Sequence, residues 1–171
     1  NRFAMLIAVL EKKVGLNLRD QDVYLNFAGG LRVTEPAADT GILTAIYSSF
    51  RGEPVDHATV VFGEVGLTGE IRAVANVDRR LQEAQKLGFR RCFMPASNLD
   101  RVERKGLDME RVGFSQVMIS FKSCSRKHMI CNNFMCPRNR HCGGGLEICV
   151  SRVGNKQDSP HLFHTFCEKH I

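Results

Sequence analysis

The sequence predicts a mixed α/β (α+β) domain, with a mixed sheet and packed helices, and three observations support this class. Segments with helical periodicity alternate with short apolar or β-branched runs between residues 3 and 121. The stretch from Gly63 to Pro95 carries strand, turn, strand, helix and strand signals with few residues between them. A hydrophobic fraction of 43% and a charged fraction of 25% are ordinary for a globular domain, so a well-buried core is expected.

The first predicted elements are an amphipathic helix and a half-buried strand. Gly15 is expected to end the helix, whose apolar residues recur at spacings of three and four: Phe3, Leu6, Ile7, Leu10 and Val14. Residues 22–28 alternate enough to predict a strand, which the glycines at 29 and 30 break. Residues 31–34 are then expected to return as its hairpin partner.

A central helix is predicted to start at Pro36, because proline suits the first turn of a helix. Glu35 stands near the positive end of this helix, where an acidic side chain is favourable. One face consists of small residues, which allow close approach of another element: Ala37, Ala38, Gly41, Ala45 and Ser48. The bulk comes from Ile42, Leu43, Ile46, Tyr47 and Phe50.

The second half of the domain is predicted from turn and cap residues. Gly63 and Gly66 permit a sharp reversal or a close backbone approach, and turn geometry accounts for them without a ligand. Asn76 is a predicted N-cap, Gly88 ends the helix that follows, and Pro95 stops a strand. The elements expected here are strands over residues 60–62, 68–73, 91–94 and 109–112, and helices over residues 76–87, 98–105 and 115–121.

Charge and cysteine are distributed unevenly, which predicts two parts, residues 1–122 and residues 123–171. The first part has 17 Lys and Arg against 15 Asp and Glu, and the second has 7 against 3. Six of the seven cysteines and five of the six histidines also fall in the second part. We therefore expect one α/β domain followed by a Cys/His-rich, irregular extension.

Three interpretations of the extension stay open. Its densest cluster is Cys131, Cys136, His141 and Cys142, and thiolates and imidazoles are zinc ligands, but paired C-x-x-C motifs are missing. Disulfides are a second interpretation, which a reducing cytosol disfavours. Three consecutive glycines and the lack of apolar periodicity favour a poorly ordered segment, or one not selected to fold, over a zinc site.

The overall charge and the missing motifs bound the function. A pI near 9.1 makes an anionic partner such as nucleic acid a reasonable expectation. No G-x-x-x-x-G-K-[ST] motif is present, so no nucleotide cofactor is expected in this chain. No apolar run is long enough to span a membrane, and we expect no membrane partner.

Three runs of the sequence carry a family resemblance: AMLIAVLEKKVGLNLRDQDVYLNFAGGLRVTEPAAD, SSFRGEPV and VVFGEVGLTGEIRAVANVDRRLQEAQKLGFRRCFMPASN. Over residues 3–122 the chain resembles the C-terminal domain of the bacterial RadA (Sms) family of DNA-repair proteins, which is similar to the proteolytic domain of Lon. The resemblance implies a Lon-like fold, a role in recombination and branch migration, and a ring-shaped homo-oligomer. It also implies contact with single-stranded or branched DNA and with a recombinase, and a bacterial cytoplasmic location, or an organellar one in a eukaryote. In the family a zinc finger and an ATPase, with ATP and Mg, precede this domain.

The same resemblance marks the two positions where a Lon protease carries its serine nucleophile and lysine base. Ala37 stands at the serine position and Asp78 at the lysine position. A methyl group cannot attack a carbonyl, so we expect no serine-lysine proteolysis. Ser48 and Ser49 lie further along the same helix without a matching lysine. A Lon-type serine peptidase and a scaffold domain without a DNA role remain the alternatives.

Seven basic residues are candidates for contact with the DNA backbone, because guanidinium groups bind phosphate bidentately. Arg32 and Arg72 are favoured, since they lie in the family-like motifs GGLRVTE and GEIRAV. A solvated surface explains each residue about as well. The full set is Arg32, Arg72, Arg79, Arg80, Lys86, Arg90 and Arg91.

Overall fold

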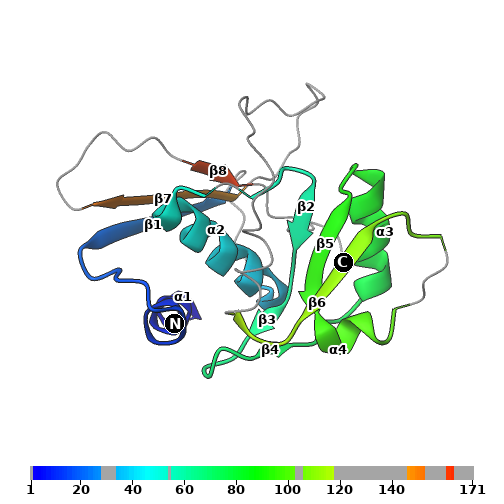
Figure 1. Cartoon of the computed structure of the whole chain (residues 1–171), viewed down its shortest axis with the longest axis horizontal. Coiled ribbons are helices and arrows are strands. Elements are labelled where there is room, and N and C mark those ends of the chain that lie inside the picture. The colour runs from blue at the N-terminus through cyan, green and yellow to red at the C-terminus, as the bar shows by residue number, and fades with distance from the viewer. Residues whose placement is uncertain are drawn as a thin grey trace.

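The structure is a computed structural model that describes residues 2–27, 34–53, 55–102, 106–117, 146–152 and 161–163 (Figure 1). Its helices are α1 (Arg2–Val9), α2 (Asp39–Arg51), α3 (Val77–Lys86) and α4 (Ala96–Leu99), with a π-helical turn η1 (Leu10–Val14) and a 3-10 turn η3 (Pro36–Ala38). Its strands are β1 (Gln21–Phe27), β2 (Thr59–Val61), β3 (Glu64–Val65), β4 (Ile71–Arg72), β5 (Arg91–Pro95), β6 (Glu110–Phe114), β7 (Leu146–Arg152) and β8 (His161–Phe163).

The strands form one parallel and two antiparallel sheets within the described ranges. β2, β5 and β6 are parallel, with β5 in the middle. β3 pairs antiparallel with β4, and β1, β7 and β8 form an antiparallel sheet with β7 in the middle. Helices packed with both parallel and antiparallel strands confirm the predicted mixed α/β class.

The parallel sheet separates two hydrophobic clusters. Side chains alternate along β2, so that Val60 belongs to the cluster with α3, whereas Val61 belongs to the cluster with α1 and α2. β5 repeats this alternation, with Cys92 and Met94 on the α3 side and Phe93 on the α2 side. Because both faces of a strand in such a sheet are buried, the sequence shows a continuous apolar run rather than an alternating one.

Helix α2 is the central helix that the sequence predicts. Residues 39–46 are buried all round the helix, including its polar Asp39, Thr40 and Thr44. It contacts α1, β2, β3 and β7, and Figure 1 shows it between the parallel sheet and the sheet of β1, β7 and β8. Pro36 starts η3 as predicted, and Gly52 ends α2 with a φ of 66°.

Gly63 fixes the close contact between β2 and the start of α2. Its N–H donates to the carbonyl of Ala37 at 2.8 Å, and its carbonyl accepts from the N–H of Thr40 at 3.2 Å. A Cβ at this position would lie 3.0 Å from Ile71 Cγ2 and 3.2 Å from both Pro95 Cγ and Thr40 Cγ2. The predicted close backbone approach at Gly63 is therefore present, and the segment that it approaches is the start of α2 rather than a ligand.

Several predicted boundaries shift, and packing explains the shifts. Helix α4 spans Ala96–Leu99, where a helix over residues 98–105 was predicted, and its buried Asn98 side chain accepts from the N–H of Val74 and donates to its carbonyl. Strand β6 continues to Phe114 beyond the predicted residues 109–112, since Phe114 is part of the core. Asn76 does stand at the N-cap of α3, with a φ of 56°, but its side chain makes no cap hydrogen bond.

Some predicted elements lie outside the described residues. Of the hairpin partner at 31–34 the structure describes Thr34, which is in no helix or strand, and of the helix at 115–121 it describes residues 115–117, with Val117 helical. β7 and β8 belong to the Cys/His-rich extension, for which no strand was predicted. β7 pairs with the whole of β1, from Gln21 opposite Arg152 to Phe27 opposite Leu146. The boundary at 122 and the order of the rest of the extension stay predictions.

Candidate functional site

Ala37, the residue at the predicted nucleophile position, is buried at the start of the central helix. Pro36 precedes it in η3, and its relative exposure is 4%. Its carbonyl accepts the hydrogen bond from the N–H of Gly63. The position therefore offers a methyl group that is packed into protein.

Asp78, the residue at the predicted base position, lies in the first turn of α3 and is exposed. A carboxylate in this turn is favourable because the helix N-terminus carries a partial positive charge. Ser48 is buried at the opposite end of α2 from Ala37, and its hydroxyl donates to the carbonyl of Glu53. This serine thus has a structural partner, in the loop that ends the helix.

Two ion pairs flank Ala37 in the sequence, and neither was predicted. On one side the guanidinium of Arg80 contacts the carboxylate of Glu35. On the other side Arg2 donates to both carboxylate oxygens of Asp39, at 2.7 and 2.5 Å. Each pair joins residues far apart in the sequence, so no local motif could have revealed it.

Arg80 differs from the other predicted DNA-contacting residues because it is buried. Its side chain is 6% exposed, and its Nε also donates to the carbonyl of Ala75 at 3.1 Å. A buried guanidinium with these partners cannot reach a phosphate on the surface without breaking them. We therefore assign Arg80 to the structure of the domain and remove it from the set of DNA contacts.

Arg2 and Asp39 belong to a longer line of charges. Asp39 is 1% exposed, and it also accepts from the N–H of Val65 at 3.0 Å. Hydrogen bonding to Asp39 raises the pKa of Arg2. The guanidinium of Arg2 lies 3.8 Å from Glu64, and Glu64 lies 3.6 Å from Arg72.

This line ends in the turn between β3 and β4. Arg72 donates to Glu70 at 2.6 Å, so the favoured phosphate contact already has two carboxylate neighbours. Glu70 accepts from the hydroxyl of Thr68 at 2.5 Å and from its N–H at 3.1 Å. The hydrogen bond from the Thr68 hydroxyl is the largest cause that lowers the pKa of Glu70 to about 2.

The remaining basic candidates lie at the surface. Lys86 contacts Glu83 at 2.7 Å, and Arg91 contacts Glu110 at 2.7 Å. Arg90 is exposed between α3 and β5, and among the described residues no carboxylate forms an ion pair with it. Arg79 is exposed on α3. Arg32 lies outside the described residues.

The structure brings some of these residues together. Arg90 and Arg91 both donate their backbone N–H to the carbonyl of Ala58, at 2.8 and 3.1 Å, and Lys86 ends the helix just before them. Arg72 lies apart from this group, in the small sheet of β3 and β4. The candidate basic surface, defined here as Arg79, Lys86, Arg90 and Arg91, thus follows the outer side and the end of α3.

The weak zinc candidates, Cys131, Cys136, His141 and Cys142, lie outside the described residues. Within the part of the chain that is described, no group of three His, Cys, Asp or Glu is placed to hold a metal ion. No helix in that part is long and apolar enough to cross a membrane.

The structure is an α/β domain in which the predicted nucleophile and base positions hold a buried alanine and an exposed aspartate. A family model described as subunit ChlI of Mg-chelatase matches residues 5–98, more than half of the chain. The chain therefore belongs to this family.

Individual relatives carry a different name. The chain is 51% identical over 110 residues to the DNA repair protein RadA of Bacillus subtilis, which is 64% of this chain and 24% of the relative. It is 48% identical over 109 residues to RadA of Escherichia coli, 64% of this chain and 24% of the relative. With RadA of Aquifex aeolicus the identity is 45% over 119 residues, 70% of this chain and 26% of the relative. The chain thus spans about a quarter of the length of these curated relatives.

Proposed function

We propose that this chain is the non-proteolytic, Lon-like domain of a RadA-type DNA-repair and recombination ATPase. Its work is ring assembly and binding of the DNA backbone during recombinational repair and branch migration. The observation that carries the proposal is the burial of Ala37 where a hydrolytic domain needs a reactive hydroxyl. Identity of about half to proteins named DNA repair protein RadA supports the repair role.

The geometry around Ala37 argues against hydrolysis in more than one way. A nucleophile needs a base within hydrogen-bond reach and room for a substrate carbonyl beside it. Here the nucleophile position is a buried methyl, and the base position is an exposed carboxylate. The ion pairs Glu35–Arg80 and Arg2–Asp39 occupy the two sides of this turn. A binding role is therefore a better fit than a peptidase role.

DNA contact is assigned to the candidate basic surface, and Arg90 is its strongest member. Lys86 and Arg91 would have to exchange a carboxylate for a phosphate, whereas no such exchange within the described residues is needed for Arg90. Arg72 would also have to leave Glu70. Phosphate contacts of this kind give affinity that does not depend on base sequence and that falls with salt.

The full-length protein supplies the other activities in this proposal. An ATPase part, with ATP and Mg, precedes the domain, and a ring of copies carries several modest DNA sites on one assembly, which raises the effective concentration of each. Single-stranded or branched DNA and a recombinase are the partners, and the bacterial cytoplasm is the location. A scaffold domain without DNA contact is the alternative that the experiment must exclude.

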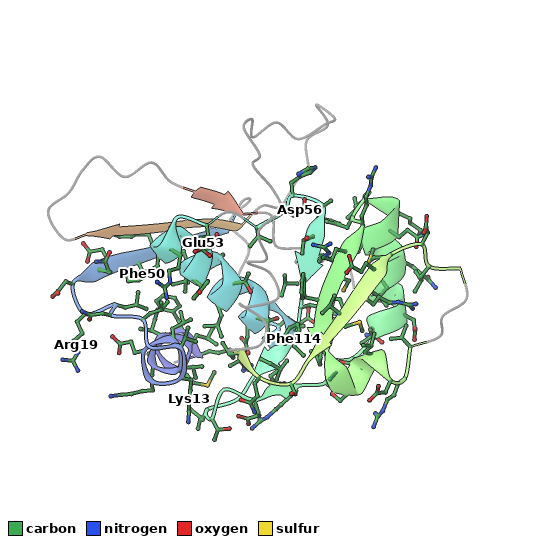
Figure 2. All side chains as sticks on the ribbon, in the orientation of Figure 1. Lys13, Arg19, Phe50, Glu53, Asp56 and Phe114 are labelled. Atoms are coloured by element: carbon green, nitrogen blue, oxygen red, sulfur yellow. The ribbon has the colours of Figure 1, made fainter. Side chains whose placement is uncertain are left out.

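A salt titration with matched variants tests DNA contact. Binding to single-stranded and branched oligonucleotides is measured for the wild type, for Arg90→Ala and for Arg19→Ala. Both variants remove one positive charge, but Arg19 lies at the end of the molecule opposite α3 (Figure 2). We expect Arg90→Ala to weaken binding several-fold and to lower the magnitude of the salt slope by about one, and Arg19→Ala to change little.

The possible outcomes separate the functions. If the wild type binds neither oligonucleotide, the scaffold alternative is correct. If both variants weaken binding equally, net charge rather than the candidate basic surface is responsible. Arg32→Ala combined with Arg72→Ala tests the two favoured motif residues in the same assay.

A further inference from the structure

Two consecutive arginines of α3 have opposite environments. Arg79 is exposed, whereas the side chain of the next residue, Arg80, is 6% exposed. A helix turns by about 100° per residue, so neighbouring side chains point in clearly different directions. Arg80 shares the buried face of α3 with Val77, Leu81 and Ala84, so Arg79 lies on the exposed face.

Arg80 is held by directional contacts at both ends of its guanidinium. Its Nη2 contacts the carboxylate of Glu35, and its Nε donates to the carbonyl of Ala75 at 3.1 Å. Glu35 directly precedes Pro36 and accepts from the N–H of Ala38 at 3.2 Å through its own carbonyl. The ion pair thus joins the start of α3 to the start of the central helix.

Another directional contact of α3 lies toward its C-terminal end, where Gln85 Oε1 accepts from the N–H of Asp108 at 3.0 Å, while near its start the helix packs through apolar side chains. Val77, Leu81 and Ala84 pack into the cluster that includes Val60 and Met94. Apolar burial is non-directional, so it attracts the helix to the sheet but tolerates a small turn about its axis. A charge-assisted hydrogen bond has a narrow range of favourable angles and distances. At the start of α3 the ion pair is therefore the contact that restricts rotation of the helix most sharply.

We propose that Glu35 and Arg80 are positioning residues for DNA binding, through the orientation that they give to α3. The inference rests on the proposed function, since it concerns the same candidate basic surface. Arg79 and Lys86 lie on the outer side of α3, and Arg90 follows its C-terminal end. When the ion pair fixes the orientation of α3, these cations can contact one phosphate backbone together. When α3 can rotate about its axis, their side chains no longer share one direction.

The variant Glu35→Gln separates positioning from charge, because the two roles predict opposite results. It removes a negative charge, so a purely electrostatic role predicts tighter DNA binding. It also removes the charged partner of Arg80, so the positioning role predicts weaker binding. We expect affinity for a single-stranded oligonucleotide to fall several-fold and the magnitude of the salt slope to fall by about one.

Two controls accompany this variant. Glu110→Gln makes the same change of charge. Glu110 pairs with Arg91 at the surface, away from the start of α3, so we expect this variant to tighten binding slightly. Val9→Ala lowers stability from the other hydrophobic cluster, and we expect unchanged binding at temperatures where circular dichroism shows it folded. Amide exchange over residues 77–81 should be faster in Glu35→Gln and unchanged in Glu110→Gln.

The outcomes distinguish this inference from the function on which it rests. Wild-type protein that fails to bind DNA overturns the proposed function, and the DNA role of the ion pair with it. Wild-type protein that binds, together with Glu35→Gln that binds equally or more tightly, overturns the inference alone. Weaker binding by Glu35→Gln beside tighter binding by Glu110→Gln supports it.

Discussion

Arg2 holds Asp39 with both arms of its guanidinium, Nε to Oδ1 at 2.7 Å and Nη2 to Oδ2 at 2.5 Å. The contact ties the first turn of α1 to the first residue of the central helix. The side chain of Asp39 is 1% exposed, whereas that of Arg2 is 42% exposed. The buried carboxylate is therefore neutralised by a cation that stays partly in contact with solvent. The consequences of removing either partner therefore differ.

Arg2→Ala should destabilise the domain by about 1–3 kcal/mol, because it leaves a buried carboxylate without its cation, and partial exposure of the pair reduces the cost. Asp39→Asn should cost less, since the amide oxygen still accepts from Val65. Urea unfolding followed by circular dichroism measures both. Equal midpoints for Arg2→Ala and the wild type would show that solvent already balances the Asp39 charge.

Restoring the residues of a serine-lysine pair should not restore hydrolysis. In the double variant Ala37→Ser with Asp78→Lys, the new hydroxyl lies where the structure is 4% exposed, and the new amine lies in an exposed helix turn. We expect no cleavage of unfolded protein or of fluorogenic peptides, with or without ATP. The matched control is Ser48→Ala with Ser49→Ala, which should leave the assay at the same background. Cleavage above that background by the first variant would show that a substrate can reach position 37, which would contradict its burial.

The carboxyl group of Glu70 should titrate near pH 2 rather than near its usual 4.5. A lowered pKa means that the folded state favours the charged form, so the contribution to stability is complete above pH 4.5. It is lost as the pH falls from 4.5 toward 2 and the carboxylate is protonated. Carbon NMR of the Glu70 side chain measures the midpoint directly. Thr68→Val, which removes the hydroxyl donor, should move the midpoint upward, and an unchanged midpoint would rule out that hydrogen bond as the main cause.

Cys92 should be inert in the folded protein, because burial raises the pKa of its thiol to about 12 and also blocks access. Alkylation with iodoacetamide at pH 8, followed by peptide mapping, should leave Cys92 unmodified. The same treatment in concentrated urea should modify it fully. Rapid native alkylation of this peptide would mean that β5 is not packed as described.

Local sequence signals predicted the central helix and the strands of the parallel sheet well. Pro36 marks the start of the central helical region, and the apolar run before Pro95 marks a strand buried on both faces. These signals act between neighbours in the sequence, so a single chain is enough to read them. Contacts such as the hydrogen bond between Asn98 and Val74 join residues 24 apart, so the sequence alone could not predict them.

The candidate site was less predictable for the same reason. The alanine and aspartate at the two predicted catalytic positions could be read from the sequence, but their burial and exposure could not. Arg79 and Arg80 are the same residue type, and although Arg80 shares the buried face of α3 with Val77 and Leu81, its charged partner Glu35 lies 45 residues away and could not be predicted. Strand β7 was missed because its pairing with β1 spans more than a hundred residues.

Two consecutive residues of β2 pack into different hydrophobic clusters, one on each face of the parallel sheet. Val60 belongs to the cluster under α3, and Val61 to the cluster under α2. Val60→Ala should therefore destabilise the cluster under α3, and Val61→Ala should destabilise the cluster under α2. Truncating each valine in turn and following the melting of the two halves separately would therefore show which side of the molecule comes apart first.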